Sequence, residues 1–335
     1  MRAKKTPVIS IVTPMFNESD LIEQNIGRLC KAMDDLGVSS ELMVVNDGST
    51  DDTAEKGAKA SAKDPRVKMV SYENNRGRGY AIKYGIAKST GDIIVVTEGD
   101  LSYGDDIVKR LATMLKEGDY DCVVASPHTK GGGMDNVPLR RAFFTKVGNW
   151  ILKWLMPVKL GTYTGMTRAY KSTVIQSLDL ESDQKELHLE IIAKLGSLGY
   201  RVGELPAKLA WPKGRKSRKG TFAPWKIIAS HLSFGIGEAP LLLLGAIAFP
   251  LICVGFILGV YLLVLSFTGT PVSGRPMLTF VPFCIVVGFI ILLIGWLAQQ
   301  NKQLQRQFHR VQTMLLRIDR SRDGKMQDKE EEYSD

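Results

Sequence analysis

Two carboxylates separated by one glycine are the residues of this sequence whose type and spacing point most directly to chemistry. Glu98 and Asp100 follow the apolar, β-branched run of residues 93–96, which is typical of a buried strand. Two acids at a strand end can bind one hard divalent cation and leave positions open for phosphate oxygens, as Mg²⁺ is usually held. We therefore predict a metal site at Glu98 and Asp100. An acidic turn without a metal is the alternative interpretation.

Two other polar turns also follow predicted strands. Asp47, in an Asn-Asp-Gly sequence, ends the run of residues 41–45 and precedes a helical stretch. A crossover connection would leave it at a strand's carboxyl end, where it can hydrogen-bond a base or ribose, although Asn-Asp-Gly alone is more typical of a hairpin. The basic, glycine-rich turn of residues 74–81, which contains Arg78 and Gly79, opens a helix and is suited to a diphosphate. A solvated loop is the alternative for this turn.

The elements that must position these side chains alternate between strands and helices. Strands are predicted at residues 8–13, 41–45, 67–71, 92–96, 120–125 and 201–205, and helices at 21–36, from about 53, up to 88, at 137–155 and at 187–198. This alternation predicts an α/β fold with a mostly parallel, Rossmann-like sheet. Pro14 is expected to end the first strand, because proline cannot continue a central ladder.

Composition and charge restrict the class of protein and the kind of partner that the sequence allows. The chain has 335 residues, 44% of them hydrophobic, and a formal net charge of +9, which favours an anionic partner. Its four cysteines show no C-x-x-C spacing, so neither a zinc site nor a disulfide framework is indicated. Cations and aromatic residues concentrate in residues 211–226, a pattern that suits single-stranded nucleic acid or a membrane surface. The apolar segments that follow favour the membrane, and no nucleic-acid partner is expected.

Two uncharged apolar segments, residues 241–267 and 278–298, each reach the roughly 20 residues that span a bilayer, and we predict two transmembrane helices. Only Arg275 is charged in the loop between them, whereas both flanks are basic. The positive-inside rule then places both ends in the cytoplasm. The apolar stretch after the basic N-terminus is too short for a signal peptide, which agrees with an N-terminal domain and a C-terminus on the cytoplasmic side of the inner or plasma membrane.

The segment after the second span has apolar residues spaced by four and three from Leu304 to Ile318. This spacing predicts an amphipathic cytoplasmic helix over residues 299–320, either lying on lipid or pairing as a coiled coil. Residues 321–335 are charged and expected to be disordered. The sequence is compatible with a homo-oligomer but does not determine the oligomeric state.

Five motifs in order make the chain similar to the family 2 glycosyltransferases with a GT-A fold, and among them to the polyprenyl-phosphate glycosyltransferases. The motifs are Thr13-Pro14-Met15-Phe16-Asn17-Glu18, Val45-Asn46-Asp47-Gly48-Ser49-Thr50-Asp51, Asn75-Arg76-Gly77-Arg78-Gly79, Glu98-Gly99-Asp100-Leu101-Ser102 and Gly165-Met166-Thr167-Arg168-Ala169-Tyr170. The resemblance implies a GT-A catalytic domain over residues 1–230, with an interfacial basic segment at about 207–235.

The resemblance also implies roles for individual residues. The nucleotide would be bound by Pro14, Phe16, Asn17, Glu18, Asp47, Arg78, Gly79 and Gly99, and Mg²⁺ or Mn²⁺ by Glu98, Asp100 and Ser102. Phosphate contacts are expected from Arg141, Thr145 and Arg168. The charge of the basic tract, rather than the resemblance, leads us to expect acceptor contacts from Arg215 and Lys219. The catalytic set would be Asp100, Arg168 and Glu186, the last either orienting the acceptor or capping a helix.

Three departures from the family pattern bear on the reaction. Glu98 stands where an aspartate is usual, Ser126-Pro127-His128 replaces a Ser-Arg-Tyr sequence, and the Q-x-x-R-W signature of processive synthases is missing. The implied reaction is an inverting, metal-dependent transfer of one sugar, from GDP-mannose or a UDP-hexose, to dolichyl or undecaprenyl phosphate. The alternative is a catalytically silent GT-A membrane protein that acts as a sugar-nucleotide sensor or glycan-assembly scaffold.

Overall fold

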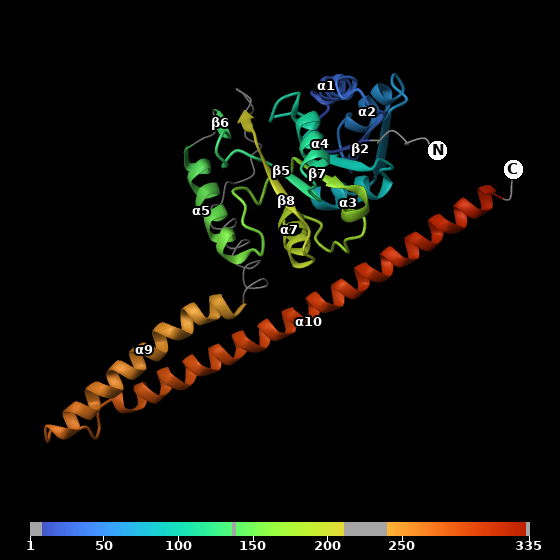
Figure 1. Cartoon of the computed structure of the whole chain (residues 1–335). Helices are drawn as coiled ribbons and strands as arrows, with labels where there is room; N and C mark the ends of the chain where they lie inside the picture. Colours follow the sequence, from blue (N-terminus) through green and yellow to red (C-terminus); the bar gives the residue numbers. More distant parts are fainter. Residues whose placement is uncertain (1–8, 136–138, 211–239, 333–335) are drawn as a thin grey trace. The chain divides into compact units, whose positions relative to one another are not determined.

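The structure, a computed structural model, describes residues 9–135, 139–210 and 240–332 (Figure 1). The chain divides into two units, residues 1–224 with 312–335, and residues 225–311. The first unit contains the sheet and its helices. The second contains an apolar helix and the apolar part of another.

A seven-stranded sheet forms the centre of the first unit, in the order β3-β2-β1-β4-β7-β5-β8. Its strands are β1 (Ile9–Met15), β2 (Ser40–Asp47), β3 (Val67–Tyr72), β4 (Ile93–Val96), β5 (Cys122–Ser126), β7 (Arg168–Lys171) and β8 (Val202–Pro206). All neighbouring pairs are parallel except those of β7, which is antiparallel to both β4 and β5. A second, two-stranded parallel sheet joins β6 (Gly133–Asp135) to β9 (Lys208–Ala210). The predicted, mostly parallel α/β sheet is confirmed.

Helices connect these strands. They are α1 (Ile22–Asp34), α2 (Thr53–Ser61), α3 (Arg78–Lys88), α4 (Ile107–Glu117), α5 (Leu139–Leu155), α6 (Ser172–Ile175) and α7 (Leu187–Ser197). Five of them, α1, α2, α3, α5 and α7, correspond to helices predicted from the sequence. In α1, Ile22, Ile26, Leu29 and Met33 recur at helical spacing and are all buried in the core. Each such side chain contributes about 1.5–3 kcal/mol relative to an exposed one, which is why this face packs onto the sheet.

Pro14 does not end β1, contrary to the prediction, because the strand continues to Met15 and pairs Pro14 with Val45 of β2. The Val12 carbonyl accepts a hydrogen bond from the Thr97 amide, 3.0 Å away, just after β4 ends. Pro14, two residues on, faces the same side of β1, where β4 offers no further partner. Its missing N–H therefore costs no ladder hydrogen bond.

Strand β7 of the large sheet and helix α4 were among the elements that the sequence did not predict. Strand β7 lies between β4 and β5, although its sequence is Arg-Ala-Tyr-Lys, and helix α4 supplies Ile107, Val108 and Leu111 to the core. A four-residue strand with polar ends lacks the apolar run by which a buried parallel strand is recognised. Its place in the sheet is set by pairing with both neighbours.

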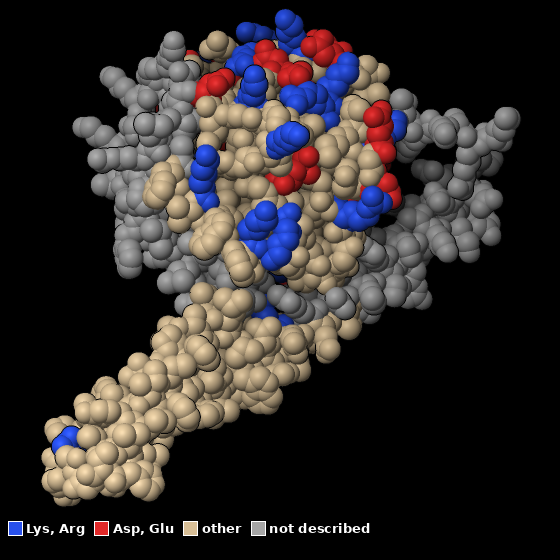
Figure 2. Space-filling model, turned by 60° about the vertical axis from the view of Figure 1, so that its left-hand side comes forward, with Lys and Arg blue, Asp and Glu red and all other residues tan. Residues whose placement is uncertain are grey.

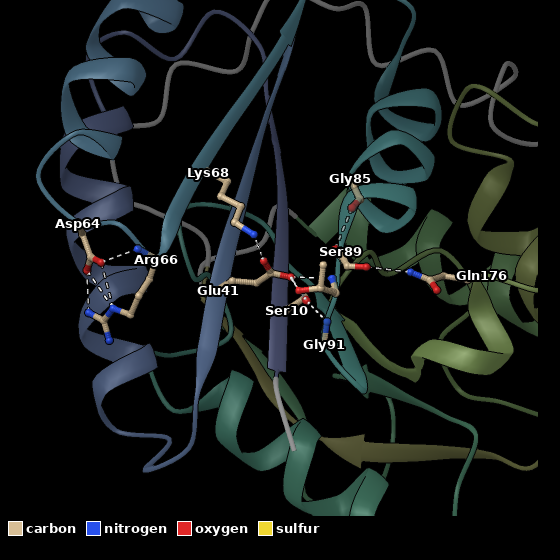
Figure 3. A network of polar contacts seen from close by, with 10 residues as sticks. Ser10, Glu41, Asp64, Arg66, Lys68, Gly85, Ser89, Gly91 and Gln176 are labelled. Carbon is tan, nitrogen blue, oxygen red and sulfur yellow. Dashed lines mark hydrogen bonds and ion pairs between the residues drawn. The ribbon is translucent and has the colours of Figure 1, made fainter. Parts of the chain in front are cut away.

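A network of polar contacts ties the amino end of the sheet together (Figure 3). The buried Glu41 carboxylate accepts hydrogen bonds from Lys68 Nζ at 2.7 Å, Ser10 Oγ at 2.6 Å, and the Thr90 amide and hydroxyl at 2.7 and 2.9 Å. Ser10 Oγ in turn accepts the Gly91 amide at 2.8 Å. Burial alone would raise the pKa of Glu41, but these hydrogen bonds outweigh it and lower the pKa from 4.5 to about 2. The network fixes the connection that leads into β4.

The second unit contains helix α9 (Pro240–Phe267) and the first part of helix α10 (Met277–Glu332). The segments Pro240–Phe267 and Met277–Gln305 are each long and apolar enough to cross a membrane, and only 11% of each apolar window is buried in the protein alone. Figure 2 shows this pair of helices as an almost uniformly uncharged surface. Glycines bring the helices together, since a Cβ at Gly255 would lie 2.8 Å from Ile285 Cγ1 and one at Gly288 would lie 2.4 Å from Ile252 Cγ1.

The C-terminal part of the chain differs from the prediction. We expected a separate helix over residues 299–320 and disorder from 321, whereas α10 continues without a break from Met277 to Glu332. Residues 299–332 are rich in Gln, Lys, Arg, Glu, Leu and Met, which are good helix formers. They can therefore extend a helix that is already nucleated in the apolar segment.

Candidate active site

The carboxyl ends of β2, β1 and β4 bring the predicted nucleotide and metal residues to one edge of the sheet. Met15 pairs with Asn46 and Val12 pairs with Val96, so the segments that follow the three strands leave at similar heights. Loop 16–19, Asp47 and the Glu98-Gly99-Asp100 turn are therefore neighbours. This is the edge at which open α/β sheets bind ligands.

Loop 16–19 is held by the loop that follows β2. The Asn17 amide donates to Ser49 Oγ at 3.0 Å, and Asn17 Oδ1 accepts the Thr50 amide at 2.9 Å. The Glu18 amide donates to Thr53 Oγ1 at 2.8 Å. Asn17 has a left-handed φ of 50°, which asparagine tolerates better than most residues. Asn17 and Glu18 thus help to build the wall at this edge, and their contacts with a nucleotide stay a prediction.

Asp47 is buried and its carboxylate fixes the glycine-rich turn. Oδ1 accepts hydrogen bonds from the Tyr72 hydroxyl at 2.8 Å and from the amides of Arg76 and Gly77 at 2.9 and 3.2 Å, and Oδ2 accepts one from Asn75 Nδ2 at 3.1 Å. Burial, and after it the hydrogen bond to Asp47, raises the pKa of Tyr72. A contact of Asp47 with a base edge, which the sequence predicts, would have to share an oxygen with these donors.

The glycines of this turn allow segment 183–184 to approach it closely. A Cβ at Gly79 would lie 2.5 Å from the Gln184 carbonyl oxygen, and one at Gly77, whose φ is +98°, would lie 2.3 Å from the Gln184 side chain. The Tyr80 amide also donates to the Asp183 carbonyl at 3.0 Å. Gly79 therefore permits a close approach between the turn and segment 183–184, and its role in nucleotide binding stays a prediction. Arg78, beside it, is exposed.

The Glu98-Gly99-Asp100 turn is held in one conformation by hydrogen bonds from within and outside it. Ser102 Oγ donates to Glu98 Oε2 at 3.1 Å and the Ser102 amide donates to Asp100 Oδ1 at 3.1 Å. A Cβ at Gly99 would lie 2.8 Å from Met15 Cε, so the turn packs directly on β1. Leu101 is buried with a left-handed φ of 46°, a conformation that costs about 1–3 kcal/mol for a non-glycine residue. The surroundings must therefore impose it.

The residues of this turn fit a hard divalent cation. Glu98, Asp100 and Ser102 offer only oxygen donors, the ligands that Mg²⁺ and Mn²⁺ prefer, and Ser102 bonds to both acidic residues. Among the residues that the structure describes, no group of three or more His, Cys, Asp or Glu side chains is placed to hold a metal alone. Two carboxylates suit a site that a phosphate-bearing ligand completes, since Mg²⁺ is commonly bound by one or two carboxylates plus substrate phosphates.

Arg168 does not fit its predicted contact with phosphate. Its side chain is fully buried, with Nε donating to the Gly165 carbonyl at 2.7 Å, Nη1 to the His188 carbonyl at 2.9 Å and Nη2 to the Tyr163 carbonyl. These bonds join segment 163–165 to α7. A buried arginine is stable only when such acceptors satisfy it, so the structure assigns Arg168 a structural role and we remove it from the catalytic set.

Helix α7 begins next to the segment that contacts the glycine-rich turn. Glu186 precedes its first residue, without a side-chain capping hydrogen bond, and is partly exposed. Glu190, which sequence reasoning missed, accepts the amides of Glu181 and Ser182, both at 2.8 Å. It thereby fixes the segment between α6 and α7, whose later residues contact Gly77 and Gly79. A glutamate within the mostly apolar stretch of residues 187–195 was the available signal.

His188, on the same helix, is buried and neither ring nitrogen has a hydrogen-bond partner. Burial, with the positive charges of Arg168 and Arg78, lowers the pKa of His188 well below 6.5. The ring is therefore neutral at physiological pH.

The Ser126-Pro127-His128 departure lies at the carboxyl end of β5. Ser126 Oγ is 2.8 Å from Thr162 Oγ1, and Glu204 accepts the Gly161 and Thr162 amides at 2.9 and 3.1 Å. Burial and the charge of Lys146 lower the pKa of His128. The polar cluster of Ser126, Thr162 and Glu204 was not predicted from the sequence.

Some predicted residues lie outside what the structure describes. Arg215 and Lys219 fall in residues 211–239, and the Arg141 side chain is not described although α5 includes the residue. Thr145, also on α5, is partly exposed. Ala210, the last described residue before residues 211–239, donates its amide to the Ser102 carbonyl at 2.8 Å and so lies beside the Glu98-Gly99-Asp100 turn.

Comparison with known proteins identifies the domain. Residues 10–175 match the family model described as Glycosyl transferase family 2. The fold is similar to that of glucosyl-3-phosphoglycerate synthase from Mycobacterium tuberculosis, with a TM-score of 0.52, 21% identity, and coverage of 68% of this chain and 79% of that chain. Residues 10–175 thus form a domain of glycosyltransferase family 2, and the sheet unit has a GT-A fold.

Its relatives indicate a narrower group. The chain is 28% identical over 190 residues to a dolichol-phosphate mannosyltransferase of Pyrococcus furiosus, which covers 56% of this chain and 52%, about half, of that protein. It is 27% identical over 258 residues to an undecaprenyl-phosphate 4-deoxy-4-formamido-L-arabinose transferase of Salmonella paratyphi B. That match covers 77% of this chain and 76% of the relative. Both relatives are named as polyprenyl-phosphate sugar transferases, as the sequence motifs predict.

Proposed function

We propose that the protein transfers a single sugar, with inversion, from a nucleotide diphosphate sugar to the phosphate of a membrane polyprenol at the cytoplasmic face. One observation carries the proposal. Loop 16–19, the Asp47-anchored turn and the Glu98-Gly99-Asp100 turn meet at one sheet edge, in a chain that also has two helices able to span a bilayer. The named relatives support the polyprenyl-phosphate acceptor.

The donor would lie along this edge with its diphosphate at Glu98 and Asp100. The structural relative has been solved in complex with Mn²⁺, uridine-diphosphate-glucose and phosphoglyceric acid, with a TM-score of 0.51, which supports a divalent cation and a nucleotide sugar here. A bound Mg²⁺ or Mn²⁺ would supply positive charge to the leaving diphosphate. GDP-mannose and UDP-hexoses are the donors to test.

This chain's own residues would orient the reactants. Loop 16–19 would bind the nucleoside, and exposed Arg78 would contact the phosphates from the start of α3. The acceptor phosphate has a second pKa of about 6, so near neutral pH it is largely ionised and has little need of a strong general base. Glu186 would then orient the acceptor rather than deprotonate it.

The acceptor is a lipid phosphate, and two features of the chain suit it. The basic tract with Arg215 and Lys219 begins one residue after Ala210, which is bonded to Ser102. Because each residue spans at most about 3.6 Å, we propose that the first cations of the tract act near the Glu98-Gly99-Asp100 turn. Such cations attract anionic lipid head groups, and bring the acceptor and donor together.

Helix α5 presents a second feature suited to a membrane surface. Phe143, Trp150 and Trp154 are 63–64% exposed, and their spacing of seven and four residues places them on one stripe of the helix. Exposed Lys146 and Lys153 accompany them. Aromatic rings with flanking cations are typical of helices in the bilayer interface. We propose that this stripe contacts the membrane.

The experiment uses the full chain in vesicles that contain undecaprenyl or dolichyl phosphate. Radiolabelled GDP-mannose and a panel of UDP-hexoses are supplied with Mn²⁺ or Mg²⁺, and transfer into the organic-extractable lipid is measured. Transfer that EDTA abolishes supports the proposal. Nucleotide binding without transfer from any donor in the panel would refute it and favour the sensor or scaffold alternative.

A further inference from the structure

Arg28, on α1, hydrogen-bonds to the main chain of the Glu98-Gly99-Asp100 turn. Its Nη1 donates to the Asp100 carbonyl oxygen at 2.6 Å, while Nε donates to Asp105 Oδ1 at 3.1 Å and Nη2 donates to the same carboxylate oxygen. One planar guanidinium therefore joins three segments, namely α1, the turn at Asp100 and the start of α4. An arginine fork can make this double contact with fixed geometry, which a point-like ammonium cannot reproduce.

The turn needs an external hydrogen bond at this place. Leu101, the next residue, has a φ of 46°, so the peptide that carries the Asp100 carbonyl lies directly before a strained residue. Relaxation of that strain would rotate this peptide and with it the Asp100 carboxylate, which is bonded to the Ser102 amide. The Nη1 bond to the carbonyl opposes this rotation.

Asn25, a second polar side chain of α1 that lies near the turn, makes no hydrogen bond to it through Nδ2. Asn25 lies one helical turn before Arg28 and faces the same segment, since a Cβ at Gly99 would lie 3.6 Å from Asn25 Nδ2 and 3.3 Å from Thr13 Oγ1. Both of these buried atoms lack a hydrogen-bond partner. The α1 side chain that does hydrogen-bond to the turn is therefore that of Arg28.

We propose that Arg28, anchored by Asp105, is a positioning residue that holds Asp100 in the geometry required for the divalent cation. This inference rests on the proposed metal site. Partners of this kind orient the ligands of a metal without touching it, and their loss typically weakens metal affinity by about 10- to 100-fold. Arg28 contacts neither the donor nor the cation in this proposal.

The test measures Mn²⁺ affinity directly, by the loss of the free-ion EPR signal, on the full-length protein in detergent with UDP present. Arg28→Gln removes the fork, and Asp105→Asn loosens its anchor. Arg66→Gln is the matched control, because Arg66 also pairs with two aspartates, Asp34 and Asp64, and its side chain is 38% exposed, against 36% for Arg28. Thermal unfolding without metal reports the purely structural effect.

We expect Arg28→Gln to weaken Mn²⁺ binding at least 10-fold, Asp105→Asn to weaken it less, and Arg66→Gln to leave it unchanged, while the two arginine variants unfold at similar temperatures. Mn²⁺ affinity of Arg28→Gln within twofold of the wild type would overturn the inference. A wild-type protein that binds no Mn²⁺ in the presence of UDP would instead overturn the metal site itself. A loss in Arg28→Gln without any change in Asp105→Asn would overturn the anchoring role of Asp105.

Discussion

Replacing Glu41 with glutamine tests how the sheet that carries the site is stabilised. Glu41 is 6% exposed and receives hydrogen bonds from Lys68, Ser10 and Thr90, which lower its pKa from 4.5 to about 2. A shift of about 2.5 units at 1.36 kcal/mol each corresponds to about 3 kcal/mol of stability at neutral pH. For a domain of this size that amounts to a fall in the unfolding temperature of roughly 6–12 °C.

The lowered pKa of Glu41 also predicts how its contribution to stability changes with pH. Because the pKa of Glu41 is lower in the folded protein, its contribution is fully present above pH 4.5 and is lost as the pH falls towards 2. The difference in unfolding temperature between wild type and Glu41→Gln should therefore shrink as the pH falls below 4.5. It is measured by differential scanning fluorimetry of the full chain in detergent.

Glu55→Gln is the control for this experiment. Glu55 also pairs with a lysine, Lys59, and has a lowered pKa, but both side chains are about two-thirds exposed. Exposed pairs contribute little to stability, so this variant should unfold with the wild type at every pH. A Glu41→Gln protein that matches Glu55→Gln at neutral pH would refute the reasoning from burial and hydrogen bonding.

Three further predictions concern the reaction. Asp100→Asn should lower sugar transfer at least about 100-fold, the scale on which removal of one charge-stabilising group acts, with an unchanged unfolding temperature; transfer within 10-fold of wild type would contradict a role in metal binding. Gly79→Ala should displace segment 183–184 and reduce kcat by about 100-fold, as a 1 Å misplacement does, whereas Gly27→Ala, where a Cβ would meet nothing within 4 Å, should not change kcat. Trp150→Gln combined with Trp154→Gln should raise KM for the polyprenyl phosphate in anionic vesicles and leave turnover of a short-chain acceptor in detergent unchanged; equal KM values in vesicles would refute membrane contact by α5.

Much of the site's position could be predicted from the sequence because it depends on local signals. Apolar β-branched runs followed by polar turns locate the carboxyl ends of β1, β2 and β4, and in a parallel sheet those ends share an edge. The Glu98-Gly99-Asp100 turn and loop 16–19 lie at that edge in the structure. The two apolar helices were likewise predictable, since length and lack of charge alone define a span.

Only the tertiary structure decided how individual polar residues are used. Arg168, predicted to contact phosphate, donates its hydrogen bonds to three backbone carbonyls. Gly79 allows the close approach of Gln184. The Asp100 carbonyl is held by Arg28, 72 residues away in sequence. Residue type tells which bonds a side chain can make, but burial and distant neighbours determine which of them it makes. A hydrophobic pattern is repeated over many residues, so it can be recognised in the sequence. A single hydrogen bond between remote segments has no such pattern and cannot be predicted from the sequence around either residue.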